Sequence, residues 1–285
     1  MPRSPIESLF SINGIEIAIW EWPGQEPAVF FCHATGFHGR IWDQVVGHFP
    51  ERHCIAFDAR GHGRSSKPAP PYGWRTFGAD VAALAEFLGL AGAIGVGHSL
   101  GGHSVTLGAA LRPSAFSALV LLDPVIRSKD EYGGSWDKTS FVRKRRNQWA
   151  SAGEMFERFE NRAPFDSWDR QVLKDYIEYG LIPDGRGFVL ACPPEVEASI
   201  YENSTAPGAN IYPEIRAVDV PVHVVRAGRC PDPRDVMKTS LTTPDLAVHF
   251  ARGRDTLLLE HSHLFPMEAP ELTADLIANA IGFLS

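Results

Sequence analysis

A serine between two glycines, in the stretch Ala93–Gly102, constrains the fold of this chain more than any other feature of its sequence. A short apolar run leads into Ser99 and a helical pattern of small residues follows it, which predicts a strand, a very tight turn and a helix. Side chains at Gly97 and Gly101 would block the close approach of that strand and helix. The turn would strain the backbone of Ser99 and push its hydroxyl out of the sheet. The Leu100 N–H and the positive end of the helix dipole would then point at any atom bonded to Ser99. Ser99 is therefore a candidate nucleophile.

The segments around this turn alternate between strands and helices. Continuous apolar runs, typical of strands buried in parallel sheets, predict strands at 28–32, 54–58, 118–122, 220–225 and 255–259. Apolar residues at helical spacing predict helices at 41–49, 77–88 and 272–284. A hairpin at 9–22, turning at Asn13-Gly14, predicts antiparallel first strands. The expected fold class is α/β, with a mostly parallel twisted sheet flanked by helices.

This alternation stops between about residues 126 and 216. Helical patterns with charged and aromatic residues occupy that segment, at 141–150, 153–161, 167–180 and after Cys192-Pro193-Pro194. We therefore expect a helical insertion at 126–216 between two parts of one core, 1–125 and 217–285. Within the insertion, the run Arg143-Lys144-Arg145-Arg146 predicts a solvated helix face, with an anion site as the alternative.

Composition restricts the class of protein. A chain of 285 residues, 44% hydrophobic and 21% charged, is large enough for one α/β core with an inserted subdomain. A formal net charge of −7 lacks the basic character of nucleic-acid and anionic-membrane binders, which favours a small neutral or weakly charged ligand. No run has the length of a signal-peptide core or a membrane span, so we expect a cytoplasmic protein. The four cysteines are expected to be free thiols, without metal-binding spacing.

Four motifs, in this order along the chain, resemble those of the α/β-hydrolase superfamily with a helical cap domain. They are His33-Ala34-Thr35-Gly36, Asp58–Ser65, Gly97-His98-Ser99-Leu100-Gly101-Gly102, and Ser262-His263 with Glu268 and Pro270 downstream. The resemblance covers essentially the whole core. It implies an α/β-hydrolase fold with an inserted helical cap that selects the substrate, and a scaffolding role for the 58–65 loop.

A serine nucleophile needs a general base within hydrogen-bond reach, and that base needs an orienting carboxylate. Among eleven histidines, His263 is the predicted base, because it follows the last strand and precedes Glu268-Ala269-Pro270, as the base of the resembled family does. His261 is the main competitor, since residues two apart on an extended chain face the same side.

The orienting carboxylate has two candidates. Most relatives carry it after the strand that here ends at Val225, but Cys230 takes that place in this chain and Asp232 follows two residues later. A smaller branch, including haloalkane dehalogenases, carries it at the end of the strand after the nucleophile helix, where this chain has Asp123. A carboxylate leaving a buried strand is costly without a partner, and His263 could be that partner. We favour Asp123 and keep Asp232 as the alternative.

The resemblance also implies an oxyanion hole beside Ser99. On the family's His-Gly-x pattern, Thr35 takes the place of the donor residue, and Ala34 stands where glycine is usual. The backbone N–H groups of Thr35 and Leu100 are the predicted donors, each worth about 3 kcal/mol of transition-state stabilisation.

Together these residues predict a serine hydrolase that cleaves small to medium carboxylic esters through an acyl-enzyme intermediate, with no cofactor and no metal. Serine disfavours epoxide hydrolysis and dehalogenation, because relatives with those activities present an aspartate there. Carbon–carbon bond hydrolysis, lactone hydrolysis and hydroxynitrile cleavage stay open on the same residues, as does a small-molecule receptor of the same fold. The expected partner is a small-molecule ester, with no nucleic acid and no membrane, and no sequence feature indicates an oligomeric state.

Overall fold

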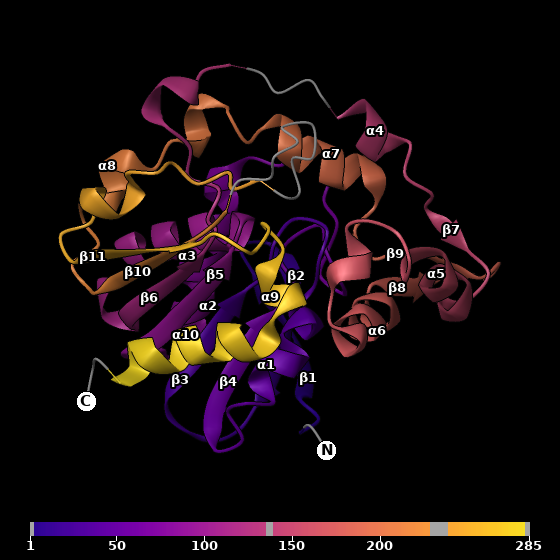
Figure 1. Cartoon of the computed structure of the whole chain (residues 1–285), viewed down its shortest axis with the longest axis horizontal. Helices are drawn as coiled ribbons and strands as arrows, with labels where there is room; N and C mark the ends of the chain where they lie inside the picture. Colours follow the sequence, from indigo (N-terminus) through magenta and orange to yellow (C-terminus); the bar gives the residue numbers. More distant parts are fainter. Residues whose placement is uncertain (1–2, 135–138, 229–238, 283–285) are drawn as a thin grey trace.

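The centre of the molecule is an eight-stranded sheet in the order β1-β2-β4-β3-β5-β6-β10-β11 (Figure 1). The computed structural model describes residues 3–134, 139–228 and 239–282. Its sheet strands are β1 (Ile6–Ile12), β2 (Ile15–Trp22), β3 (Gln25–Cys32), β4 (Arg52–Phe57), β5 (Ala93–His98), β6 (Phe116–Leu122), β10 (Val222–Ala227) and β11 (Gly253–Leu258). β2 pairs antiparallel with β1 and β4, and all other neighbours are parallel. The predicted α/β class with a mostly parallel sheet is confirmed.

The first two strands form the predicted hairpin. Asn13 and Gly14 have φ of 49° and 76°, the left-handed conformation that a two-residue turn between antiparallel strands requires. The turn joins Ile12 to Ile15, which are paired across the hairpin.

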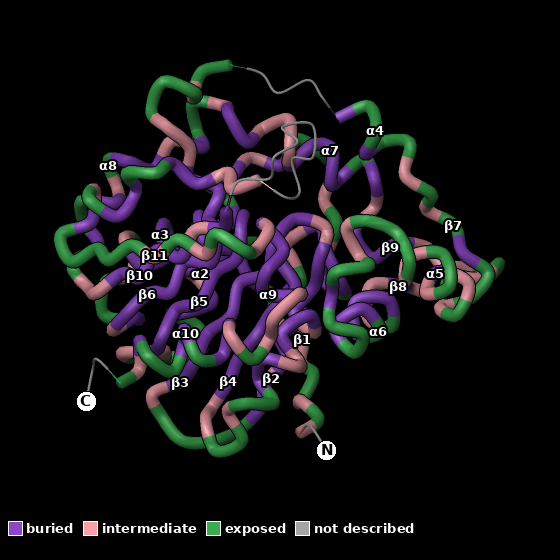
Figure 2. The backbone as a smooth tube through the Cα atoms, viewed as in Figure 1, coloured by how far each residue is buried: buried purple, intermediate pink, exposed green. Residues whose placement is uncertain are grey.

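Helices cover both faces of the sheet. On one face α2 (Trp74–Phe87) packs against α3 (Leu100–Leu111), and on the other lie α1 (Asp43–Val46), α9 (Phe265–Glu268) and α10 (Pro270–Gly282). Successive strand residues point to opposite faces, so Phe30 packs in the first layer and Phe31 in the second. The central strands are therefore buried along most of their length (Figure 2).

The segment between β6 and β10 forms a second region beside the core (Figure 1). Its helices are α4 (Ser140–Arg143), α5 (Ala152–Phe159), α6 (Arg170–Tyr179), α7 (Pro194–Glu202) and α8 (Tyr212–Ile215). It also holds a small antiparallel sheet, β7 (Gln148–Trp149), β9 (Phe188–Leu190) and β8 (Leu181–Pro183), in that order. The predicted helix over 141–150 was wrong, because α4 ends at Arg143 and β7 pairs with β9. The limits 1–125, 126–216 and 217–285 stay a prediction.

Helix starts in this region follow from capping residues. The Ser151 side chain accepts a hydrogen bond from the Glu154 N–H at the start of α5, and Asp169 accepts from the N–H groups of Gln171 and Val172 at the start of α6. Both caps satisfy N–H groups that have no acceptor inside the helix.

Short 3-10 helices join the main elements, at η1 (Gly39–Trp42), η2 (Pro113–Ala115), η3 (Lys129–Glu131), η4 (Phe165–Ser167), η5 (Pro207–Ala209) and η6 (Leu246–His249). Within the described ranges, none of the helices has the length and apolar character needed to cross a membrane. Cys32, Cys54 and Cys192 are buried free thiols, as predicted, whereas Cys230 lies outside the described residues.

Candidate active site

Ser99 lies in the turn between β5 and α3. Its φ of 56° and ψ of −117° form a strained conformation that residues other than glycine rarely adopt. The neighbouring glycines permit this turn: a Cβ on Gly97 would meet the Gly101 carbonyl, and a Cβ on Gly101 would meet the carbonyl of Cys32 in β3. The predicted strand, turn and helix are confirmed, and the turn presents Ser99 at the carboxyl edge of the sheet.

His263 reaches Ser99 from the loop between β11 and α9. Its Nε2 lies 3.1 Å from Ser99 Oγ, within hydrogen-bond distance. The His263 carbonyl accepts a hydrogen bond from His98 Nε2 at 2.8 Å. Burial lowers the pKa of His98 to about 3, so this ring stays neutral and serves as a fixed donor that positions the His263 backbone.

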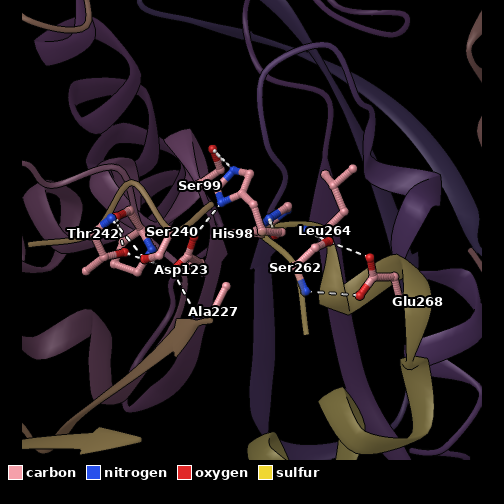
Figure 3. Close-up of polar contacts among 11 residues, drawn as sticks. His98, Ser99, Asp123, Ala227, Ser240, Thr242, Ser262, Leu264 and Glu268 are labelled. Carbon is pink, nitrogen blue, oxygen red and sulfur yellow. Dashed lines mark hydrogen bonds and ion pairs between the residues drawn. The ribbon is translucent and has the colours of Figure 1, made fainter. Parts of the chain in front are cut away.

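The loop around His263 is tied to the end of α9. Ser262 donates to the Glu268 carboxylate through its hydroxyl and through its N–H, the latter at 3.3 Å (Figure 3). His261, the competing base, faces the same carboxylate, with its Nδ1 3.8 Å from Glu268 Oε2. The structure therefore brings His263, and not His261, to the serine.

Asp123 follows β6 and holds the other nitrogen of the imidazole. Its Oδ2 lies 2.5 Å from His263 Nδ1, while Oδ1 accepts hydrogen bonds from the Ala227 N–H at 2.9 Å and from the hydroxyls of Ser240 and Thr242 at 2.5 and 3.2 Å (Figure 3). Burial favours the neutral acid, but these donors, His263 first among them, outweigh it and hold the pKa of Asp123 below its ordinary value. The carboxylate is therefore ionised at neutral pH.

The structure thus gathers Ser99, Asp123 and His263 in one chain of contacts. Asp232, the alternative acid, lies outside the described residues. Within the described ranges, no group of three or more His, Cys, Asp or Glu side chains is arranged to hold a metal ion.

Thr35 follows β3 and is buried against the same cavity as Ser99. Leu100 is the first residue of α3, so its N–H has no acceptor within the helix. The loop carrying Thr35 is held by His33, whose Nε2 accepts from the Ala59 N–H at 2.9 Å and whose Nδ1 donates to the Ala34 carbonyl at 2.7 Å. This contact attaches the loop to the 58–65 segment.

Asp58 shows why the 58–65 segment is a scaffold. Its buried carboxylate accepts hydrogen bonds from the Gly39 N–H at 2.6 Å, Trp20 Nε1 at 3.2 Å and the Arg64 N–H at 2.8 Å. Through Asp58 the segment holds Trp20 and Gly39, two other parts of the chain, in place, and no residue of the segment lines the cavity.

A cavity of about 560 Å³ lies over Ser99, Thr35 and His263. Its volume is typical of small-molecule sites. Aromatic side chains form much of its wall. Two of them, Phe37 and Trp74, belong to the core, and the others lie between β6 and β10: Phe141, Trp149, Phe159, Phe165, Trp168, Tyr176 and Tyr201.

Two arginines in this wall belong to the run that the sequence analysis assigned to a solvated helix face, with an anion site as the alternative. Arg145 follows α4 rather than lying on it, and it pairs with Glu197 and contacts the Tyr176 hydroxyl at 3.3 Å. Arg146 also lines the cavity. The signal was present, because four consecutive basic residues on a helix point in four directions and cannot all share one exposed face.

Known proteins resemble this chain in sequence and in fold. The model of the Alpha/beta hydrolase family matches residues 29–276. Lipase LipV of Mycobacterium tuberculosis is 41% identical over 116 residues, which is 39% of this chain and 43% of the lipase. This chain therefore matches less than half of the length of that relative.

A longer match is with 2-(acetamidomethylene)succinate hydrolase of Mesorhizobium japonicum, 26% identical over 265 residues, covering 90% of this chain and 89% of the relative. The crystal structure of E-2-(acetamidomethylene)succinate hydrolase superposes with a TM-score of 0.77 over 98% of this chain and 99% of that chain, at 21% identity. At this identity the superposition demonstrates a shared fold.

Proposed function

This chain belongs to the alpha/beta hydrolase family, and on that premise we propose that it is a serine hydrolase that cleaves small to medium carboxylic esters through an acyl-enzyme intermediate. The observation that carries the proposal is the sequence of contacts from Ser99 Oγ to His263 Nε2, 3.1 Å, and from His263 Nδ1 to Asp123 Oδ2, 2.5 Å. The similarity to a lipase supports ester hydrolysis in particular.

In this mechanism Ser99 Oγ attacks the ester carbonyl while His263 Nε2 takes the hydroxyl proton. Asp123 keeps the other imidazole proton on Nδ1 and stabilises the imidazolium. The carbonyl oxygen becomes negatively charged and accepts the N–H groups of Thr35 and Leu100. His263 then returns its proton to the departing alcohol, and the carbon–oxygen bond breaks to leave an acyl group on Ser99.

Deacylation reverses the same steps with water in place of the alcohol. His263 removes a proton from water as the water attacks the acyl carbonyl, and it then protonates Ser99 Oγ as the carboxylic acid leaves. The fixed donor contact from His98 and the ionised state of Asp123 support this cycle, because both keep the imidazole in one orientation.

Hydrolysis of another acyl bond on the same residues is the second candidate. It is favoured by the relative that acts on 2-(acetamidomethylene)succinate, a compound whose name describes an acetamido group rather than an ester.

The test is a substrate panel with purified protein: p-nitrophenyl esters of increasing acyl length, a lactone series and the corresponding anilides. We expect esters to be cleaved fastest and Ser99→Ala to lose at least about 10³-fold in kcat while keeping the parent's circular dichroism spectrum. Anilides cleaved faster than every ester would favour the second candidate, and a folded parent without turnover of any compound would favour a receptor.

A further inference from the structure

The cavity over Ser99 is electropositive in a chain that is acidic overall. The sequence has 34 acidic against 27 basic residues. In the described part of the chain, the cavity lining nevertheless contains a single acidic side chain, Glu197, and five arginines, namely Arg127, Arg145, Arg146, Arg158 and Arg162. A cavity lined by one sign of charge concentrates ligands of the opposite sign.

Two of these arginines are neutralised by close partners. Arg145 pairs with Glu197, and Arg146 pairs with a glutamate of α5 at 2.5 Å. Arg158 lies near that glutamate, and its charge helps to lower the pKa of that carboxyl. Among the described residues, Arg158 and Arg162 form no ion pair, and both are exposed to solvent. Positive charge therefore remains available on the α5 side of the cavity.

Arg127 differs from the other arginines of the cavity in two ways. Its side chain is mostly buried, and its backbone lies two residues after Val125, which is hydrogen-bonded to Ser99. The Val125 N–H donates to the Ser99 carbonyl at 3.1 Å, and two residues of backbone span at most about 7 Å. The Arg127 side chain is 13% exposed and lines the same cavity as Ser99. Its carboxylate partner, Glu131, lies at 3.3 Å, a long distance for a charged hydrogen bond.

Arg127 Nε is buried and has no hydrogen-bond partner in the described ranges. A buried donor without an acceptor costs about 1–3 kcal/mol, more when the group is charged, so such atoms in folded proteins usually mark a ligand or a bound water.

Three more donors in the cavity wall share this condition. Trp149 Nε1, Trp168 Nε1 and Ser204 Oγ are buried without a partner among the described residues, and their side chains belong to residues only 2%, 8% and 3% exposed. The one carboxylate in the lining, that of Glu197, is already engaged by Arg145. The residues that line the cavity therefore carry unpaired donors and positive charge, and a carboxylate, which has only acceptors and a negative charge, complements both.

We propose that the substrate carries a carboxylate in addition to the bond that is cleaved, and that Arg127 binds this carboxylate. The inference rests on the proposed function, since it names the substrate class of the same site. Arg158 and Arg162 attract the anion toward the cavity, and the aromatic walls contact the carbon skeleton between the carboxylate and the carbonyl that Ser99 attacks.

The test compares esters that differ only at the group facing Arg127. For the acyl side the pair is mono-p-nitrophenyl glutarate and p-nitrophenyl 5-methylhexanoate, in which an isopropyl group replaces the carboxylate. For the alcohol side the pair is 4-acetoxybenzoate and 4-isopropylphenyl acetate. In at least one pair we expect the carboxylate ester to have a kcat/KM about 10- to 100-fold higher, the range of a hydrogen bond to a charged group.

Arg127→Gln should reduce this ratio of kcat/KM values to about one, mainly through a higher KM for the carboxylate ester, and Arg127→Lys should keep part of it. The ratio does not depend on how much of a variant is folded, because both esters meet the same enzyme sample. Arg143→Gln is the matched control: Arg143 lies on α4, pairs with Glu202 at 2.6 Å and is absent from the cavity lining, so the parent's ratio should persist.

Equal kcat/KM values for both esters of each pair, or a preference that survives in Arg127→Gln, would overturn the carboxylate site while leaving Ser99-dependent ester hydrolysis intact. If no ester is cleaved, the proposed function fails, and calorimetry with glutarate on the Ser99→Ala protein tests the site alone. Binding that Arg127→Gln abolishes would then support the carboxylate site, and absence of binding would overturn it.

Discussion

Asp123 illustrates how single side chains set the chemistry of the site. A carboxylate this deeply buried is tolerated because His263, the Ala227 N–H and two hydroxyls all donate to it. Asp123→Asn keeps the size but loses the charge that holds the imidazole tautomer. We expect kcat to fall by up to about 10⁴-fold with little change in KM, measured by steady-state kinetics on the best ester of the panel.

Asp232→Asn is the companion variant, because the sequence left both carboxylates open. Asp232 lies outside the described residues, and we expect its variant to stay within roughly tenfold of the parent. A dead Asp232→Asn protein beside an active Asp123→Asn protein would assign the acid to the segment after β10 instead.

The two neighbouring histidines make a second comparison between single side chains. His263→Ala should remove ester turnover to the level of Ser99→Ala, because Ser99 then has no base at 3.1 Å. His261→Ala removes a side chain that faces Glu268 and should cost much less activity. Initial rates on one ester decide the matter, and a greater loss at His261 would contradict the assignment.

The turn between β5 and α3 depends on how closely the two elements approach β3. Gly101→Ala would drive a Cβ into the Cys32 carbonyl, a backbone atom that cannot move aside, and we expect a loss of about 3 kcal/mol in unfolding free energy. Gly153→Ala on α5 is the matched control, since the nearest atom to its added Cβ is Ser151 Oγ at 3.6 Å. That variant should be neutral or stabilised by up to about 1 kcal/mol in urea unfolding. Equal stability of the two variants would contradict close packing at the turn.

The sequence predicted the elements in which a turn admits only certain residues. It did not predict the short strands that exist only because they pair with each other. Asn13-Gly14 predicted the hairpin because few residues accept positive φ, and Gly97 and Gly101 predicted the turn for a steric reason. β7 and β9 have two and three residues, too few for any periodicity, and they exist because they pair with each other. The missed position of Arg145 has the same origin, since the predicted helix ends early and β7 follows it.

Across the whole molecule, buried neutral histidines couple stability to pH. Burial lowers the pKa of His98 to about 3 and those of His38 and His103 to about 4. Below about pH 6.5 the unfolded chain binds protons at these rings and the folded protein does not, so acidification favours unfolding. Each ring should cost about 2 kcal/mol of stability at pH 5 relative to pH 7.

His103 allows this coupling to be measured on a ring that does not itself line the cavity; it packs on Trp74 at 4.9 Å and donates to the Ala209 carbonyl at 2.9 Å. Urea unfolding at pH 7 and pH 5 should show a decline in His103→Gln that is smaller than the parent's by about 2 kcal/mol. The same decline in both proteins would show that this ring is not neutral in the folded state.

The charge of the cavity wall is also a property of the whole molecule, and the average composition of the chain could not predict it. Ser99 and His263 could be singled out from the sequence because each follows a core strand within a recognisable motif, whereas the acid stayed open between Asp123 and Asp232. The wall is assembled from segments far apart in sequence, so its arginines appear together only after folding. A net charge of −7 favoured a neutral or weakly charged ligand, yet the lining of this one cavity is positive.

The most direct test of the central claim, that His263 and Asp123 activate Ser99 as a nucleophile, is labelling with a fluorophosphonate followed by intact-mass and peptide mass spectrometry. The reagent forms a stable bond only with an activated serine, so we expect one adduct per chain, located on Ser99 and absent from Ser99→Ala and His263→Ala. An adduct on a different residue, or ester turnover that continues unchanged in a chain fully labelled at Ser99, would contradict it.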